Sequence, residues 1–212
     1  MTILFDLDGT LIDSTEAILQ SFHYSYDFYG MACPPDNHIK AQIGHPLDVM
    51  YKQIGLKDKK LINNMVDAYK EHYREISTEK TTLLPFAKEA VMLASRHATL
   101  GIVTTKTSKY SKVLMEHFKL MEYFDTLIGR EDVINPKPSS EPIEKAISFL
   151  NVDKSNCWMI GDTRMDMQCA INANVRGVGV IGEYETTQEL QKYTNIIKPN
   201  ALEAVKKIIS LI

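Results

Sequence analysis

Hydrophobic and polar positions alternate in two different ways along this chain, and the pattern changes near residue 80. Before that point apolar positions recur at helical spacing, in three segments at residues 14–30, 46–55 and 57–76. Asp13, followed three residues later by Glu16, has the spacing of a capping box and predicts the start of the first helix. Gly30 and Gly55 are expected to end the first two helices. This stretch is therefore predicted to be helical.

From Thr82 onward, short apolar strands alternate with amphipathic helices. The strands are expected at residues 98–105, 123–129, 157–161 and 176–181, and the helices at residues 86–97, 108–118, 140–151, 165–174 and 201–212. In the first of these helices we expect one buried face, made by Phe86, Ala90, Leu93 and Ala94. A further apolar strand opens the chain at residues 2–7.

Alternation of this kind predicts an α/β fold with a doubly wound, Rossmann-like parallel sheet. The strands are apolar almost without interruption, as expected where helices cover both faces of the sheet. The first strand belongs to this sheet, so the helical stretch must be an insertion. We predict an α/β core formed by residues 1–13 and 82–212, and an inserted helical cap domain at residues 14–81.

The first predicted strand ends in two aspartates, Asp6 and Asp8, with Gly9 and Thr10 directly after them. Side chains two positions apart on a strand point to the same side, so both carboxylates are predicted to face one site. Gly9 allows the chain to turn tightly there. Two like charges beside a buried strand are costly unless a positive group neutralises them.

Three further strand ends carry polar residues of matching chemistry. Ligands bind at the carboxyl ends of the strands in sheets of this type. The residues are Thr104 and Thr105 in "GIVTTKT", Lys137 in "NPKPSS", and Asp162 with Asp166 in "MIGDTRMD". Three or four carboxylates form a hard oxygen site suited to Mg²⁺, and a lysine with hydroxyl donors suits phosphoryl oxygens. We interpret Asp6 and Asp8 as a pair neutralised by a metal and by Lys137.

These four segments resemble the sequence motifs of the haloacid dehalogenase-like phosphatases. "FDLDGTLIDS", "GIVTT", "NPKPSSEP" and "MIGDTRMD" occur in the expected order, and the helical insertion is similar to the C1 cap of that family. The resemblance implies that Asp6 is the nucleophile, which forms an aspartyl-phosphate, and that Asp8 is the general acid and base. Thr104 and Lys137 would bind the phosphoryl group. The implied Mg²⁺ ligands are Asp6, the backbone carbonyl of Asp8, Asp162 and, in support, Asp166.

Asp8 favours a phosphatase over a dehalogenase within this family. An alcohol leaving group needs a proton, whereas a halide does not. The motifs resemble most the phosphoglycolate phosphatase group, so phosphoglycolate is one expected substrate. A pyrophosphatase, a sugar phosphatase or a β-phosphoglucomutase of the same fold are the alternatives. From other classes, a phospho-aspartate receiver domain and a non-catalytic binding protein remain rivals, although an insertion of this size would be foreign to a receiver.

Substrate contacts are expected from both predicted domains. On the core we assign them to Gly9, Thr10 and Thr105, where Thr105 departs from the Asn that many relatives carry. In the cap, "IGHPLD" places His45 between Gly44 and Pro46, in a turn predicted to point at the site. Lys106 and Arg164 lie near the motifs and are interpreted as surface charges.

The composition of the chain argues against some classes of binding partner. The chain has 212 residues, 44% of them apolar, a net charge of −3 and three cysteines without metal-type spacing. These values argue against nucleic acid or a membrane as the main partner. No basic segment precedes Asp6, so a signal peptide is not expected. We predict a cytoplasmic protein, a monomer or weak homodimer, that acts on a small phosphorylated metabolite.

Overall fold

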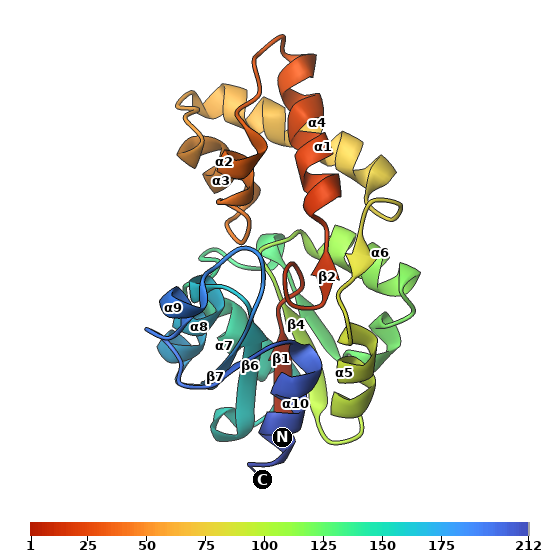
Figure 1. Cartoon of the computed structure of the whole chain (residues 1–212), viewed down its shortest axis with the longest axis vertical. Coiled ribbons are helices and arrows are strands. Elements are labelled where there is room, and N and C mark those ends of the chain that lie inside the picture. Colours follow the sequence, from red (N-terminus) through yellow and green to blue (C-terminus); the bar gives the residue numbers. More distant parts are fainter. Residues whose placement is uncertain (212) are drawn as a thin grey trace.

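A computed structural model describes residues 1–211 and contains a parallel sheet of six strands (Figure 1). Their order is β5 (Thr126–Ile128), β4 (Thr99–Val103), β1 (Thr2–Phe5), β6 (Cys157–Gly161), β7 (Arg176–Val180) and β8 (Ile197–Lys198). All neighbouring strands of this sheet run parallel. The first strand of the chain therefore lies in the middle, with crossovers to both sides, and the predicted α/β fold is confirmed.

Helices cover both faces of the sheet. On one face lie α5 (Ala87–Ala94), α6 (Ser108–His117) and α10 (Ala201–Ile209), and on the other lie α7 (Glu141–Leu150) and α8 (Arg164–Ala173). Successive side chains of a strand point to opposite faces. In β1, Ile3 and Phe5 accordingly pack into the core on the first face, and Leu4 packs into the core on the second. This two-sided burial explains the uninterrupted apolar sequence of the strand.

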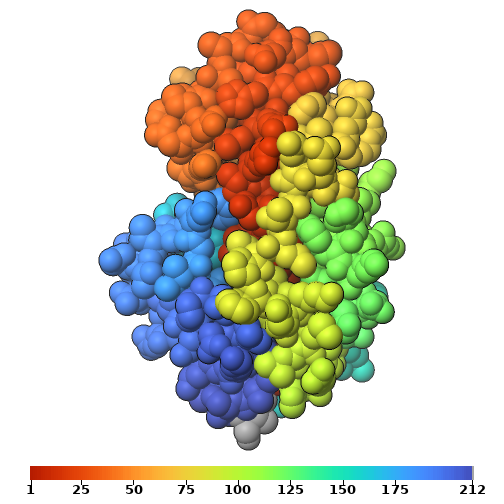
Figure 2. Space-filling view, turned by 45° about the vertical axis from the view of Figure 1, so that its right-hand side comes forward, coloured from red at the N-terminus to blue at the C-terminus, as the bar shows by residue number. Residues whose placement is uncertain are grey.

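Four of the five α-helices between β1 and β4 form a separate lobe with its own core. They are α1 (Thr15–Phe28), α2 (Asp36–Lys40), α3 (Leu47–Gln53) and α4 (Lys59–Ile76). Phe22, Tyr51 and Met65 lie in this second core and are fully shielded from solvent. Figure 2 shows the lobe, in red to yellow, above the rest of the molecule. In Figure 1 the N-terminus, where β1 begins, lies at the opposite end, so the carboxyl ends of the parallel strands face the helical lobe.

The chain passes between the sheet and the lobe through two short strands. β2 (Ile12–Asp13) and β3 (Thr82–Leu83) pair in antiparallel fashion, with Ile12 opposite Leu83. The entry to the lobe and the exit from it are thus held side by side. We retain residues 1–13 with 82–212, and residues 14–81, as the predicted domains.

The structure corrects several local predictions. β1 ends at Phe5 and not at residue 7, so the alternation of a strand does not reach Asp8. The capping box of Asp13 and Glu16 is wrong, because the Asp13 carboxylate accepts a hydrogen bond from the Thr15 amide at 2.9 Å instead. Phe86 is 52% exposed, with a left-handed φ of 64°, and so does not belong to the buried face of α5.

Several short elements carried no sequence signal that we interpreted. They are α2, β8, α9 (Thr187–Leu190) and the 3₁₀ turns Met121–Tyr123, Arg130–Asp132 and Lys154–Asn156. Such elements contain too few residues for a hydrophobic period to be visible. Within residues 1–211, no helix is both long and apolar enough to cross a membrane.

Candidate active site

Asp6 lies at the carboxyl end of the central strand, where the crossovers to the two halves of the sheet diverge. Its backbone amide donates a 2.9 Å hydrogen bond to the Ile160 carbonyl of β6, which fixes the residue against the neighbouring strand. The side chain is almost fully buried. Ligand sites of doubly wound sheets occur at this position, because the loops on the two sides separate and leave a crevice.

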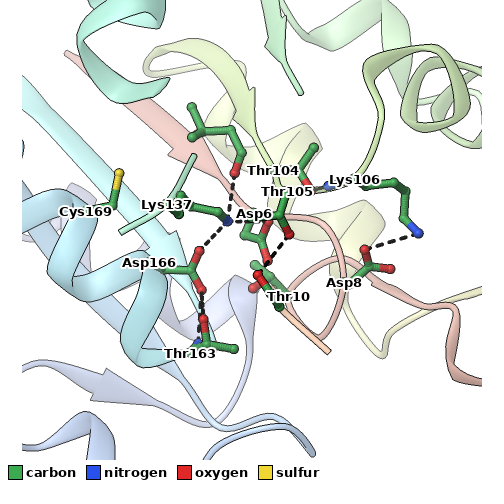
Figure 3. Close-up of polar contacts among 12 residues, drawn as sticks. Asp6, Asp8, Thr10, Thr104, Thr105, Lys106, Lys137, Thr163, Asp166 and Cys169 are labelled. Carbon is green, nitrogen blue, oxygen red and sulfur yellow. Dashed lines mark hydrogen bonds and ion pairs between the residues drawn. The ribbon is translucent and has the colours of Figure 1, made fainter. Parts of the chain in front are cut away.

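Lys137 reaches this carboxylate from the loop between β5 and α7. Its Nζ lies 2.7 Å from Asp6 Oδ1 and 2.5 Å from Asp166 Oδ1, and it also donates to the Val103 carbonyl at 3.1 Å (Figure 3). Burial disfavours the ammonium, but the Asp166 and Asp6 carboxylates together outweigh it and raise the pKa of Lys137. Lys137 is therefore a protonated lysine held in a fixed position between Asp6 and Asp166.

Asp162 and Asp166 complete a cluster of three buried carboxylates with Asp6, whose ligand atoms all lie within 4.8 Å of one another. Asp166 is fully satisfied, because its second oxygen accepts hydrogen bonds from the Thr163 amide at 3.0 Å and the Thr163 hydroxyl at 2.8 Å. Asp162 is not. The Thr10 hydroxyl donates to its Oδ1 at 3.1 Å, while Oδ2 is buried without a hydrogen-bond partner among residues 1–211.

Gly9 permits the close packing around this orphaned oxygen. A Cβ at position 9 would lie 2.1 Å from Asp162 Oδ2, and the φ of +81° is one that glycine adopts without strain. The Gly9 amide donates to the Ile12 carbonyl at 2.9 Å, within the turn that follows Asp8. Contacts of Gly9 and Thr10 with a substrate stay a prediction. The Gly9 amide already donates within the turn, and the Thr10 hydroxyl already donates to Asp162.

The charges of the cluster do not balance within the protein. Burial raises the pKa of Asp6 to about 7, against the opposing effect of Lys137, and Asp166 adds to the rise. Burial, followed by the charges of Asp166 and Asp6, raises the pKa of Asp162 well above its usual value. Three carboxylates share one ammonium, and one buried oxygen lacks a partner. Carboxylate oxygens at this spacing fit Mg²⁺, which would supply the missing positive charge.

Asp8 points away from this cluster. Its carboxylate lies 3.3 Å from Lys106 Nζ through Oδ2 and accepts a short hydrogen bond from the Ser14 hydroxyl at Oδ1 (Figure 3). The prediction that Lys137 neutralises both aspartates is therefore wrong for Asp8. The physical reason is that β1 ends at Phe5, so Asp6 and Asp8 do not follow strand alternation.

Lys106 is a largely enclosed residue of the site and not the surface charge that its loop position suggested. Its side chain is 9% exposed, and Nζ donates to the Tyr73 hydroxyl of α4 at 2.9 Å. Burial disfavours its charge, but Asp8 together with Tyr73 raises the pKa above the usual value. The lysine thus connects Asp8 on the sheet side with a tyrosine of the helical lobe.

Thr104 and Thr105 follow β4 and have different surroundings. The buried Thr104 accepts a 3.2 Å hydrogen bond from the Lys106 amide at its hydroxyl. The Thr105 hydroxyl donates to the Gly44 carbonyl at 2.9 Å and so joins the core to the turn that contains His45. The turn also meets α8, since a Cβ at Gly44 would lie 3.4 Å from Thr163 Cγ2. The predicted direction of this turn, toward the strand ends, agrees with these contacts.

A pocket of about 350 Å³ opens between the helical lobe and the loop after β4. Asp8, Thr105, Lys106 and His45 all line it, whereas Asp6, Lys137, Asp162 and Asp166 do not. The site therefore has two parts, a buried carboxylate cluster and an adjoining pocket, with Asp8 at the pocket wall. Burial, with a smaller effect of Arg164, lowers the pKa of His45, which keeps its imidazole neutral near pH 7.

Tyr184 is a site residue that the sequence analysis missed. Its hydroxyl lies 2.7 Å from the Thr15 hydroxyl at the start of α1, and its ring packs beside Gly9. Tyr184 follows β7, so the strand-end rule that identified the other residues also applies to it.

The family model of the haloacid dehalogenase-like hydrolases matches residues 3–180. The chain belongs to this family. It is therefore an enzyme, and the receiver-domain and non-catalytic interpretations are set aside. All four motif segments lie within the matched range.

Individual relatives agree with this assignment. The pyrophosphatase PpaX of Halalkalibacterium halodurans is 32% identical over 209 residues, which cover 96% of each chain. A predicted phosphatase from Clostridium acetobutylicum superposes with a TM-score of 0.89 at 27% identity, covering 99% of this chain and 98% of that one. A predicted phosphoglycolate phosphatase from Haemophilus somnus has a TM-score of 0.86 at 20% identity over 97% and 96% of the two chains, and shows the shared fold alone.

Proposed function

We propose that the protein is a Mg²⁺-dependent phosphatase that hydrolyses a small phosphate monoester through an aspartyl-phosphate on Asp6. The observation that carries this proposal is the cluster at the end of β1. Lys137 there bridges Asp6 and Asp166, and Asp162 presents a buried oxygen without a partner. A carboxylate fixed beside an ammonium at a strand end is well placed to attack phosphorus.

In the first proposed step, an oxygen of Asp6 forms a bond to phosphorus while the bond from phosphorus to the ester oxygen breaks. The leaving oxygen takes a proton from Asp8, which lies at the wall of the adjoining pocket. Lys106 and Ser14 fix the orientation of the Asp8 carboxylate. Lys137 and the Thr104 hydroxyl are assigned to the oxygens of the transferring phosphoryl group.

In the second step, Asp8 removes a proton from water, and the hydroxyl oxygen attacks phosphorus. The bond between phosphorus and Asp6 breaks, which releases inorganic phosphate and returns Asp6 as a carboxylate. Asp8 regains the proton that it lost in the first step. Lys137 stays protonated throughout, because its two carboxylate neighbours raise its pKa.

Asp6, Asp162 and Asp166 would hold Mg²⁺, with the backbone carbonyl of Asp8 as a further oxygen ligand. When bound, the metal would neutralise the carboxylates and the phosphoryl oxygens, so that anionic substrate and anionic nucleophile can approach. The support for this assignment is the charge imbalance of the cluster and the orphaned Asp162 oxygen.

The identity of the ester is a separate question from the chemistry. Relatives bear the names of a pyrophosphatase and a phosphoglycolate phosphatase. Phosphoglycolate and inorganic pyrophosphate are therefore the first substrates to test, and a sugar phosphate or a phosphoglucomutase activity is a further alternative. All share the phosphoryl site and differ in the group that enters the pocket.

We also infer that the enzyme acts in the cytoplasm as a monomer or weak homodimer, without nucleic acid or membrane as partner. Its thiols support a reducing compartment, since Cys33, Cys157 and Cys169 are all free. Size-exclusion chromatography with light scattering would test the oligomeric state.

Phosphate release tests the proposed function. Purified protein is incubated with phosphoglycolate, pyrophosphate, sugar phosphates and an aryl phosphate, each with Mg²⁺ and with a chelator. We expect turnover of at least one ester with Mg²⁺ and none with the chelator. Turnover of no compound, or full activity in the chelator, would contradict the proposal.

A further inference from the structure

The leaving portion of a substrate would extend into the pocket beside Asp8. Asp8 lies at the pocket wall and is the proposed acid for the leaving oxygen, so the group attached to that oxygen enters here. Three helices of the lobe and the loop after β4 bound the pocket, and its volume of about 350 Å³ falls within the range of small-molecule sites. The chemistry of its lining therefore selects the leaving portion.

Each of the three acidic side chains of this pocket has a partner of its own. Asp8 pairs with Lys106 at 3.3 Å, and Asp48 pairs with Lys52 of the same helix at 3.2 Å. Glu131 accepts a hydrogen bond of 2.9 Å from the first backbone amide of α6, where the helix dipole favours a carboxylate. These acids are thus compensated without the other basic side chains of the pocket.

Two basic side chains of the pocket, Lys70 and Arg130, form no ion pair with a carboxylate of residues 1–211. Both residues are half-buried. Arg130 Nη1 donates to the Val133 carbonyl at 3.1 Å, which fixes the guanidinium without neutralising its charge. The pocket and the ion-pair partners of its acids hold three carboxylates against four cations, Lys52, Lys70, Lys106 and Arg130. The balance is positive, and the uncompensated charges are those of Lys70 and Arg130.

Lys70 and Arg130 come from different domains but are held by one segment of the core. The Arg130 amide donates to the Lys106 carbonyl at 3.0 Å. Four residues further along, the hydroxyl of Tyr110, which also lines the pocket, donates to the Lys70 carbonyl at 3.2 Å. Residues 106–110 therefore fix the backbone of both cations beside the same wall. The Lys106 side chain extends from this segment to Asp8, so the two cations adjoin the proposed acid.

We propose that the leaving group carries a second anionic group, a carboxylate or a phosphate, which binds Lys70 and Arg130. This inference rests on the proposed phosphatase function for the position of the transferring phosphoryl group. A guanidinium offers two parallel donors to either kind of oxyanion, and the lysine adds a further charge-assisted contact. Because Lys70 belongs to the lobe and Arg130 to the core, such an anion also joins the two domains. A neutral alcohol of the same length leaves both cations uncompensated.

Binding of paired phosphonates, measured by calorimetry with Mg²⁺ in excess, tests this subsite without turnover. Phosphonoacetate, 3-phosphonopropionate and 4-phosphonobutyrate are compared with ethyl-, propyl- and butylphosphonate, which have the same number of carbon atoms but no carboxylate. At the chain length that reaches both cations, we expect the carboxylate compound to bind at least about tenfold more tightly. This preference should shrink between about 0.02 M and about 0.5 M salt, because ions screen half-exposed charges. Equal affinities at all three lengths would overturn the proposal.

Charge-removing variants locate the effect. Lys70→Gln and Arg130→Gln should each reduce the preference for the carboxylate compound by about threefold to tenfold, and Lys70→Arg should retain most of it. Lys60→Gln and Arg96→Gln are the matched controls, because both residues are exposed, lie outside the pocket and lose the same charge. If Arg130→Gln does not fold, Lys70→Gln decides the outcome with its own control. A preference that survives in Lys70→Gln, or that falls equally in Lys60→Gln, would overturn the subsite.

Phosphate release then distinguishes the two kinds of anion. At each chain length, the phosphate ester of a hydroxy acid and the bisphosphate of a diol are compared with the plain alkyl phosphate. We expect kcat/KM of at least one anionic ester to exceed that of the alkyl phosphate by about tenfold or more. The higher of the two values identifies the second group as a carboxylate or as a phosphate. Values no higher than that of the alkyl phosphate for both anionic esters would contradict the proposal.

An aryl phosphate separates this inference from the proposed function. Hydrolysis of the aryl phosphate together with equal affinities within every phosphonate pair would overturn the anion subsite and leave the phosphatase intact. A preference for the carboxylate compounds without hydrolysis of any ester would do the reverse. The expected result is hydrolysis of the aryl phosphate together with a carboxylate preference that depends on Lys70 and Arg130.

Discussion

Lys106 Nζ lies 3.3 Å from Asp8 Oδ2, and both side chains are largely buried between the sheet and the helical lobe. The same ammonium donates to the Tyr73 hydroxyl of α4 and lies 4.6 Å from the centroid of its ring. Since Asp8 is the proposed acid and base, the lysine is a positioning residue. Its contacts orient the carboxylate toward the pocket and make that orientation depend on the lobe.

Lys106→Met removes the charge while keeping much of the side-chain length. We expect kcat for alkyl esters to fall by about one to two decades, as for the loss of part of a general acid–base contribution. Hydrolysis of an aryl phosphate should fall less in the first step, because its leaving group needs little protonation. Lys112→Met is the control, since Lys112 is 63% exposed and its 3.8 Å contact with Glu116 is a surface ion pair. Equal losses for both ester classes would indicate a general structural defect.

Asp8→Asn separates the proton transfer from the position of the residue. The variant can still accept a hydrogen bond but cannot carry a proton in either step. Phosphoenzyme formation from alkyl esters should be impaired most, and formation from aryl phosphates least. Rapid-quench measurement of the first turnover with both ester types gives the comparison. The same loss for both would mean that Asp8 acts only through structure.

Metal binding should be visible without turnover. Mg²⁺ at about a hundred times its Kd would stabilise the fold by ~2.7 kcal/mol. For a chain of this size that corresponds to a Tm increase of about 5–10 °C. The physical reason is that, among residues 1–211, Lys137 is the one cation paired with the three buried carboxylates, and it contacts Asp6 and Asp166 but not Asp162. Differential scanning calorimetry with Mg²⁺ and with a chelator measures the shift.

Asp162→Asn refines this measurement. The substitution removes a buried charge whose Oδ2 has no partner among residues 1–211, so Tm in the chelator should stay equal or rise. The Mg²⁺-dependent increase should shrink by at least half. Asp67→Asn, at an exposed position of α4, should keep the full increase. The metal assignment would be contradicted if the wild-type Tm did not change on addition of Mg²⁺, or if Asp162→Asn kept the full Mg²⁺-dependent increase in Tm.

His45→Ala tests the turn between α2 and α3. His45 lines the pocket, and the neighbouring Gly44 carbonyl accepts the Thr105 hydroxyl at 2.9 Å. We expect the order of preferred substrates to change while aryl phosphate hydrolysis is mostly retained. Because burial lowers its pKa, His45 is neutral at pH 7 and above, so the change should be the same at pH 7 and pH 8. An unchanged substrate order with unchanged kcat/KM values would assign His45 to packing.

The strand ends made much of the site predictable from sequence. The carboxyl ends of parallel strands meet at one edge of the sheet. This edge brings together four residues that are up to 160 positions apart in the sequence: Asp6, Lys137, Asp162 and Asp166. Tyr184 could have been found by the same rule, because it follows β7. The helical lobe was visible as well, since its apolar positions recur at helical spacing over whole helices.

Two features of the site depended on tertiary structure. The direction of Asp8 could not be predicted, because it follows from β1 ending at Phe5, and element ends are the least certain part of a sequence interpretation. Lys106 resembled a solvated loop lysine because its partners Asp8 and Tyr73 are distant in sequence. The pocket wall combines residues of three helices of the lobe, and no single helix shows which of its positions line the pocket.

Asp6→Asn is the simplest probe of the nucleophile. The amide keeps the shape of the side chain but lacks the attacking oxyanion, so the rate should fall by at least about three decades. Near-normal turnover would rule out covalent catalysis at this residue. Because Asp6 also pairs with Lys137 at 2.7 Å, a loss of activity alone does not separate the nucleophile from a charge partner.

Chemical trapping of the phosphoenzyme tests the central claim most directly. Asp8→Asn protein, which should form the aspartyl-phosphate from an aryl phosphate but hydrolyse it slowly, is quenched and reduced with borohydride. Reduction converts an acyl phosphate to an alcohol, so an aspartyl-phosphate becomes homoserine. Peptide mass spectrometry should find homoserine at position 6, dependent on both substrate and Mg²⁺. Homoserine at another aspartate, or none while the aryl phosphate is still being consumed, would contradict a covalent intermediate on Asp6.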